Sequence, residues 1–402
     1  MTTNIVILGA GYSGLLMALR LARTTRFMGG RVALVDASPI FGDRIRQHEL
    51  SVRAQAPRRI DTLIDGTGVE LVLGRVTSVD LAHSLVRVEA ESRETVLRFD
   101  RLVYALGSYT DTDAVAGIRD HAHVFSRCDV ERMRVALPAL AARNGRLLVC
   151  GGGLTGIEAA TEFAEAFPAL RVTLTTSGQL GAGASPKAQR YLRAAFARLG
   201  LQLIEATRVT RIAAGRAYTS ADPIDFDLCL WAGAFAVPPL AREAGLCVNE
   251  RGQALVDDGF QSLSHANVMV VGDAAVPAVD AGSQLRMACA TSTAMGAHAA
   301  DALVASLSGA AQRPFRMTYL ARNISLGRRD GVIDWVSSDD RPRNLIWTGR
   351  LAAAYKNMIG SFVWRSISGE SRRSSTYQIA LAGLQLFAGN RADNTKHYAR
   401  SK

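Results

Sequence analysis

Two glycine-rich turns constrain the fold of this chain more than any other feature. Residues 9–14 read G-A-G-Y-S-G and residues 151–156 read G-G-G-L-T-G. Each turn follows a short apolar run, residues 4–8 and 147–150, and precedes a stretch with the apolar periodicity of a helix. A strand, a glycine turn and a helix in this order form a nucleotide-binding unit. The sequence therefore predicts two copies of this unit.

The first turn has the residues that a pyrophosphate requires. Gly9 permits a tight turn, Gly11 leaves room for the phosphates, and Gly14 lets the helix pack closely on the strand. Asp36 ends the next strand, where a carboxylate accepts hydrogen bonds from ribose hydroxyls. The alternative is an ordinary strand–helix turn, which does not require the acid. We expect a dinucleotide here.

The second turn lacks the ribose acid. Thr176 stands at the corresponding position. A neutral hydroxyl does not repel a 2′-phosphate, and no arginine directly follows the strand to bind one, so the choice between NADH and NADPH stays open. A vestigial second turn is the alternative interpretation.

The remaining pattern is typical of an α/β fold with two Rossmann-like domains. Residues 100–107 and 227–233 are similar apolar strands that end in small residues, and residues 267–273 form a later buried strand. Runs at 69–73, 85–88 and 96–99 alternate as in a β-meander, and a helix rich in small residues spans about 285–306. We expect a split first domain (1–110 and 240–312), an inserted second domain (111–239) and a C-terminal segment (313–402).

With V-V-G-D-A-A at residues 270–275, the two turns resemble the flavoproteins that have two dinucleotide-binding domains. This superfamily includes the pyridine nucleotide–disulphide oxidoreductases and the type II NADH dehydrogenases, and the resemblance covers about residues 4–305. It implies FAD on the first turn and NAD(P)H on the second. It also implies that Asp273 holds the ribityl chain and that Glu158 lies near nicotinamide and flavin. An acid that merely starts a helix is the alternative for Glu158.

The resemblance implies further cofactor-binding positions in both halves of the chain. They are Ser13, Val76, Ala105, Gly107, Gly272 and Leu285 for FAD, and Gly151, Gly153, Gly156, Thr176 and Gly233 for the nicotinamide nucleotide.

The segment after the first acid departs from the disulphide reductases. They carry a C-x4-C pair there, whereas residues 40–60 contain no cysteine, so we expect no thiol–disulphide relay. Arg46 in this segment either stabilises a flavin anion or belongs to a solvated basic loop. His48 is the best histidine for proton transfer, because imidazole titrates near neutral pH, although an ordinary structural histidine is the alternative.

A second departure concerns the acceptor. Type II NADH dehydrogenases have paired glutamines at a helix start that lines the quinone pocket, and Ser292 and Thr293 take their place here. This replacement weakens the case for a respiratory quinone. Cys289 in the same stretch is either a small core residue or a neighbour of the flavin. The five cysteines form no C-x-x-C pair, and we expect no metal site.

The positive charge lies in the C-terminal segment. Residues 313–402 hold 16 basic and 6 acidic side chains, which account for nearly all of the net charge of +11. Residues 345–347 and 351–359 look amphipathic and are flanked by arginines. Residues 341–402 therefore form either a peripheral membrane contact, a cap on the flavin domain or a homodimer interface. No nucleic-acid-binding motif accompanies the charge, so we expect no nucleic acid partner.

The leading hypothesis is an FAD-dependent NAD(P)H dehydrogenase that passes electrons to a quinone or another small aromatic acceptor. One alternative is a flavoenzyme that oxidises an organic substrate directly and has a relic nicotinamide site. Another is a flavin-dependent redox-signalling or binding module. We expect the protein in the cytoplasm or at the inner face of the membrane, because the first strand leaves no room for a signal peptide.

Overall fold

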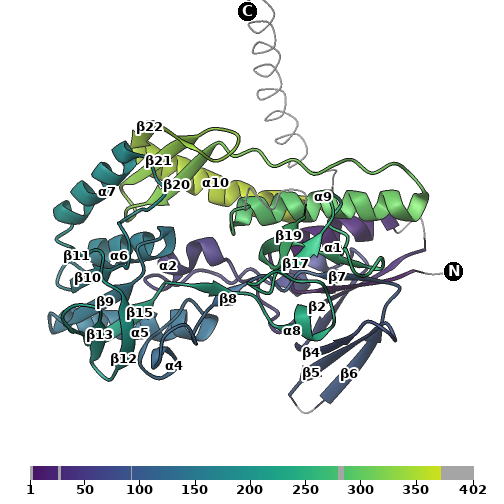
Figure 1. Cartoon of the computed structure of the whole chain (residues 1–402), viewed down its shortest axis with the longest axis horizontal. Helices are drawn as coiled ribbons and strands as arrows, with labels where there is room; N and C mark the ends of the chain where they lie inside the picture. The colour runs from purple at the N-terminus through teal and green to yellow at the C-terminus, as the bar shows by residue number, and fades with distance from the viewer. Residues whose placement is uncertain (1–2, 26–28, 92, 279–284, 373–402) are drawn as a thin grey trace, which may run out of the picture.

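The computed structural model describes residues 3–25, 29–91, 93–278 and 285–372 (Figure 1). Two parallel sheets, each accompanied by helices, lie at opposite ends of the molecule. A C-terminal antiparallel sheet lies over the second of them, and a long helix runs from this sheet toward the first. The predicted α/β class with two Rossmann-like units is confirmed.

The first parallel sheet has the strand order β18-β7-β1-β2-β3. Its strands are β1 (Asn4–Leu8), β2 (Arg31–Asp36), β3 (Val69–Leu73), β7 (Arg101–Tyr104) and β18 (Val268–Val270). The adjoining helices α1 (Tyr12–Thr25) and α9 (Cys289–Ser308) pack against each other. A methyl group added at Gly296 would lie 2.6 Å from the carbonyl oxygen of Ser13, so small residues in α9 permit this close approach.

The second parallel sheet has the order β11-β10-β9-β15. Its strands are β9 (Arg146–Cys150), β10 (Arg171–Thr175), β11 (Gln202–Ile204) and β15 (Leu228–Trp231). The helices of this unit are α5 (Arg127–Ala142), α6 (Leu154–Ala166) and α7 (Pro186–Arg198). Ser126 and Ser185 cap α5 and α7 by accepting backbone N–H groups, which satisfies donors that a helix start leaves unpaired. A second apolar core forms here, separate from the core of the first sheet.

Two expectations about the strands and helices need correction. Residues 69–73 do not belong to the meander, because β3 pairs in parallel with β2 and extends the first sheet. The meander consists of β4 (Arg75–Asp80), β5 (Leu85–Ala90) and β6 (Arg93–Arg98). Alternation of apolar and polar residues does not by itself distinguish a parallel edge strand from a meander strand. The helix expected from residue 285 begins only at Cys289.

The described part of the C-terminal segment, residues 313–372, forms a compact unit, and residues 373–402 lie outside the described residues. The unit contains the antiparallel strands β20 (Ala321–Ser325), β21 (Gly331–Val336) and β22 (Pro342–Thr348), followed by α10 (Gly349–Gly369). Residues 345–347 lie in β22, and residues 351–359 lie in α10. This unit contacts α6 and α7 of the second sheet as well as α1 and α9 of the first (Figure 1). No helix of the described residues is long and apolar enough to span a bilayer.

The remaining elements are short. They are η2 (Arg44–Arg46), α2 (Gln47–Leu50), α3 (Ile60–Ile64), β8 (Tyr109–Thr110), α4 (Ile118–His121), β12 (Val209–Ala213), β13 (Arg216–Thr219), β14 (Ile224–Asp225), β16 (Phe235–Ala236), α8 (Leu240–Glu243), β17 (Ala254–Val256), η3 (Gly272–Ala274) and β19 (Ala275–Pro277).

Candidate functional site

The first glycine turn connects β1 to α1 and leaves an open space at its centre. A methyl group added at Gly9, whose φ is +97°, would lie 2.6 Å from the carbonyl oxygen of Ala105, and one at Gly14 would lie 1.9 Å from that of Gly9. A methyl group at Gly11 would meet nothing within 4 Å. The outer glycines are therefore required by the protein's own packing, whereas the space at Gly11 is available to a ligand at the helix start.

Asp36 holds the same turn from the end of β2. One of its carboxylate oxygens accepts the N–H of Ala10 at 2.7 Å and the other accepts the N–H of Ser38 at 2.9 Å. Burial raises the pKa of Asp36, and these two hydrogen bonds oppose the rise. Each oxygen keeps a lone pair for a further donor such as a ribose hydroxyl.

The second turn, between β9 and α6, repeats this geometry. Methyl groups at Gly151 and Gly156 would lie 2.9 Å from Ala232 and 2.0 Å from Gly151, whereas one at Gly153 would meet nothing within 4 Å. Thr176 lies beside this turn, since a methyl group at Gly152 would come within 2.6 Å of its hydroxyl oxygen. The second turn therefore offers the same kind of open helix start as the first.

A cavity of about 560 Å³ lies between the two turns and the C-terminal unit. Asp273 lines it and accepts the hydroxyl hydrogen of Ser108 at 2.6 Å. Arg44, also in the lining, donates to the carbonyl oxygen of Ser108 at 2.6 Å. Gly272 lies next to the first turn, because a methyl group there would be 2.9 Å from the Ser13 hydroxyl oxygen.

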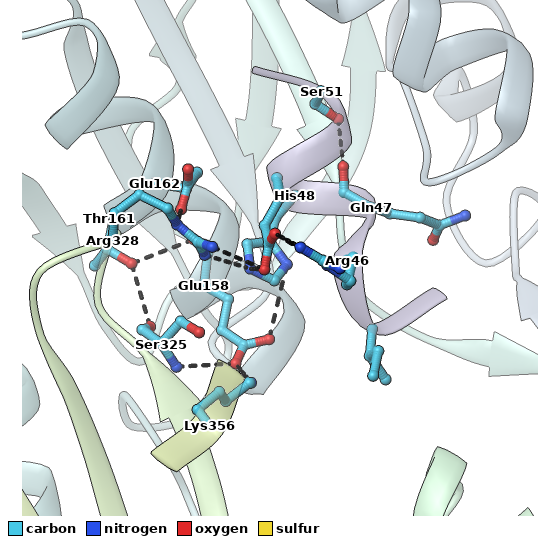
Figure 2. Close-up of polar contacts among 12 residues, drawn as sticks. Arg46, Gln47, His48, Ser51, Glu158, Thr161, Glu162, Ser325, Arg328 and Lys356 are labelled. Carbon is cyan, nitrogen blue, oxygen red and sulfur yellow. Dashed lines mark hydrogen bonds and ion pairs between the residues drawn. The ribbon is translucent and has the colours of Figure 1, made fainter. Parts of the chain in front are cut away.

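Glu158 enters the cavity from α6 and is paired with Lys356 of α10 (Figure 2). Oε1 of Glu158, the oxygen that pairs with Lys356, also accepts the N–H of Ser325 at 3.0 Å. Lys356 also donates to the carbonyl oxygen of Asn323 at 3.0 Å. The C-terminal unit thus supplies a cation to the cavity and holds the carboxylate that the sequence singled out.

His48 lies at the centre of this cluster on α2 (Figure 2). Burial, followed by the positive charge of Lys356, lowers its pKa to about 3. The expectation that His48 titrates near neutral pH is therefore wrong, because the buried imidazole stays neutral. The side chain lines the cavity, so a role in it remains a prediction.

Arg46 does not line the cavity; it forms an ion pair with Glu49 at 2.9 Å. Arg44, which the sequence analysis did not select, occupies the cavity wall instead. Both arginines lie in η2, a single 3-10 turn. The direction of that turn decides which arginine points into the cavity, and the sequence does not specify this direction.

The other predicted cofactor positions are distributed around the two turns. Ala105 and Gly107 follow β7, and Gly233 follows β15, at the ends of strands adjacent to the glycine turns. Val76 lies in β4, and Leu285 precedes α9. Both side chains pack against the apolar core of the first sheet. Their contacts with a cofactor stay predictions.

Several residues of the cavity wall escaped the sequence analysis, above all Lys356 and Arg44. Tyr12 of the first glycine turn also lines the cavity, and its buried hydroxyl donates to Asp43 at 2.8 Å. Burial raises the pKa of the Cys289 thiol to about 11, so this wall residue carries a neutral thiol. The basic character of the C-terminal segment was visible, but not which lysine enters the cavity.

A comparison with known families identifies the fold. The sequence profile of the pyridine nucleotide-disulphide oxidoreductases matches residues 3–300. The chain belongs to this family. Within it, the chain is 28% identical to demethylphylloquinone reductase from Synechocystis, over 82% of this chain and 86% of the relative.

Two solved structures are similar in fold. The sulfide:quinone oxidoreductase of Aquifex aeolicus has 15% identity and a TM-score of 0.79, covering 94% of both chains. NDH2 from Plasmodium falciparum, in complex with NADH, has 13% identity and a TM-score of 0.76, covering 89% of this chain and 94% of that one.

Proposed function

We propose that this protein is an FAD-dependent NAD(P)H dehydrogenase that passes electrons to a quinone. The observation that carries this proposal is the pair of glycine turns, each open at its middle glycine and both adjoining one cavity. The relative from Synechocystis reduces demethylphylloquinone according to its name, which supports a quinone over other small aromatic acceptors.

The first unit and the second sheet would hold different cofactors. We assign residues 1–110 and 240–312 to FAD, residues 111–239 to NAD(P)H and residues 313–402 to a C-terminal unit. The open space at Gly11, where an added methyl group would meet nothing within 4 Å, leaves room for a pyrophosphate at the start of α1, and Asp36 and Asp273 offer acceptors for hydroxyl groups. The free space at Gly153 argues for a working second site in place of a relic.

When bound, FAD would supply the redox chemistry by taking a hydride from NAD(P)H and delivering electrons to the acceptor. The side chains would bind, orient and exclude water. Glu158, fixed by Lys356 and Ser325, is suited to accept a hydrogen bond from a nicotinamide carboxamide. Residues 40–60 offer no thiol for a relay, and burial keeps Cys289 protonated.

The decisive experiment is anaerobic mixing of the yellow protein with NADH and, separately, NADPH. We expect the flavin absorbance near ~450 nm, a property of the cofactor, to bleach and to return when a soluble quinone is added. No bleaching with either nucleotide would contradict the proposal and favour direct oxidation of an organic substrate. Bleaching that oxygen but no quinone reverses would overturn the acceptor assignment.

We further propose that the protein binds the inner face of the membrane through a C-terminal apolar face, formed by Leu345, Trp347, Leu351 and Met358. Leu351 is 80% exposed and Met358 follows it by two helical turns on the same side of α10. Trp347 lies 6.1 Å from the ring of Tyr355 and is half exposed. Exposed arginines flank the face, as is typical of peripheral membrane contacts.

Co-sedimentation with vesicles tests this contact. Replacing Trp347 and Leu351 together by serine removes apolar transfer free energy of about 3 kcal/mol, or about a hundredfold in partitioning. Val135→Ser is the matched control, because Val135 is 77% exposed on α5. We expect the double variant alone to lose binding to phosphatidylglycerol vesicles. Unchanged binding, with a change of sedimentation mass in the absence of vesicles, would indicate a homodimer interface instead.

A further inference from the structure

His48 is a buried titratable residue to which the proposed function gives no role. It lies on α2, only 4% exposed, and its ring faces groups from three other segments (Figure 2). These groups are Arg328, between β20 and β21, Glu158 of α6 and Lys356 of α10. The two ring nitrogens have different partners, and this difference defines the state of the imidazole.

The nearest polar partner of Nε2 of His48 is a group that can only donate, the Nη2 atom of Arg328 at 3.5 Å. Oε1 of Glu49 is also near Nε2, at 3.9 Å, which is longer than a hydrogen bond. Arg328 is held in place, because its guanidinium forms ion pairs with Glu49 at 2.9 Å and with Glu162 at 2.8 Å. A guanidinium has no acceptor, so a hydrogen on Nε2 would face another N–H group. This contact favours the lone pair on Nε2 and the ring hydrogen on Nδ1, because Oε1 of Glu49 is farther away and is already bound by Nη1 of Arg328.

The Nδ1 atom points to the carboxylate of Glu158. Its distance to Oε2 of Glu158 is 4.0 Å, which is a charge–dipole contact and longer than a hydrogen bond. The other oxygen, Oε1, is occupied by Lys356 and by the N–H of Ser325. Both oxygens of Glu158 thus face donors, which favours a single orientation of the carboxylate.

The charges around His48 oppose protonation of the ring. The cations near it are Lys356, Arg328 and Arg46, and the anions are Glu49 and Glu158. Glu162 adds an anion behind Arg328, with which it is paired. Because burial and the cations outweigh the anions, the pKa of His48 falls to about 3.

We propose that His48 is a positioning residue: a neutral imidazole, protonated on Nδ1, that transmits the fixed position of Arg328 to the carboxylate of Glu158. Its task is to keep the carboxylate of Glu158 oriented toward the cavity, beside Lys356. The importance of this orientation for nicotinamide binding rests on the proposed function, but the state of the imidazole does not.

The state of His48 can be measured without turnover. In FAD-loaded protein labelled with ¹⁵N-histidine, seven histidines contribute signals, and the signal missing from His48→Asn identifies His48. We expect the ¹⁵N shifts of a neutral Nδ1–H tautomer throughout pH 6–9. An imidazolium signal at neutral pH, or the Nε2–H tautomer, would overturn the proposal even if the enzyme is fully active.

Three substitutions separate the two nitrogens. Asparagine places an amide near the Nδ1 position and keeps a donor toward Glu158. Glutamine reaches the Nε2 position and keeps an acceptor for Arg328, while leucine removes both. We expect the rate of flavin bleaching by NAD(P)H to fall about tenfold in His48→Leu and His48→Gln, and less in His48→Asn, which retains the donor.

The dependence of the bleaching rate on nucleotide concentration distinguishes orientation from simple loss of stability. In His48→Leu the concentration that gives half of the maximal bleaching rate should rise, because the carboxylate of Glu158 loses the contact that orients it, whereas His48→Asn should keep the profile of the wild type. Equal rates and profiles in all three variants would refute the positioning role. If neither nucleotide bleaches the wild type, the proposed function fails, and the ¹⁵N result still decides the state of His48.

Discussion

Replacement of Gly153 by alanine separates nucleotide binding from folding. Gly153 is the N-cap residue of α6, with φ −76° and ψ 177°, an extended conformation that any residue adopts. The added methyl group meets no protein atom within 4 Å. Alanine is a poorer N-cap than glycine but loses less conformational entropy on folding, and each effect is worth about 1 kcal/mol or less. The free energy of unfolding should therefore change by less than about 1 kcal/mol.

The bound nucleotide, in contrast to the folded chain, should not tolerate the added methyl group. A methyl group in the open space of the turn would push a pyrophosphate away from the backbone N–H groups at the start of α6. Loss of one hydrogen bond to a charged group costs about 1.5–3 kcal/mol, which corresponds to a KM for NAD(P)H that is about 10- to 150-fold higher. The kcat should change little, since the reacting groups lie elsewhere in the cavity.

Steady-state kinetics, FAD content and thermal unfolding of Gly153→Ala test this reasoning, with Gly11→Ala as the matched variant. Gly11 has the same free space in the first turn, so its replacement should reduce FAD content and leave the nucleotide turn intact. An unchanged KM in Gly153→Ala would refute the assignment of the second turn. Loss of FAD from Gly153→Ala would show that the two turns have been assigned to the wrong cofactors.

Three further outcomes follow from the site. Lys356→Met removes the cation beside Glu158 and should slow flavin bleaching about tenfold. Arg365→Met, at an exposed position of the same helix, should leave the rate unchanged. Equal rates in both variants would contradict a role for the Lys356–Glu158 ion pair. Thr176→Asp places a carboxylate beside the second turn and should raise the KM for NADPH more than that for NADH; a parallel change would place the ribose elsewhere. The unfolded chain protonates His48 near pH 6.5 and the native state only near pH 3, so the free energy of unfolding should decrease as the pH is lowered through this window, by up to about 1.4 kcal/mol per pH unit. Urea unfolding of His48→Asn should lack this component, and an identical slope in both proteins would refute the buried neutral state.

The two nucleotide units were predictable because their signals are local. Gly9 and Gly14 pack against backbone atoms a few residues away or on the adjacent strand, so any chain with this turn needs glycine there. The position of Asp36 is also a local signal, because it ends the strand that follows the helix of the first turn. The meander was misplaced at its first strand because residues 69–73 alternate in the same way whichever strand they pair with.

The cavity wall was less predictable. Arg44 and Arg46 are two residues apart in one turn, and only the folded chain decides that Arg44 faces the cavity while Arg46 pairs with Glu49. His48 was selected for a pKa near neutrality, but that choice assumed contact with water. Its burial among Arg328 and Lys356 reverses the argument.

The sequence by itself determined the two glycine turns, the acid at the end of the second strand, the two Rossmann-like units and the family, because backbone conformation and short-range apolar periodicity are properties of neighbouring residues. Only the tertiary structure decided that Lys356 meets Glu158, 198 residues away, and that Arg328 joins α2 to α6 beside His48. Ion pairing and desolvation depend on distance in space, and a linear sequence does not contain that distance.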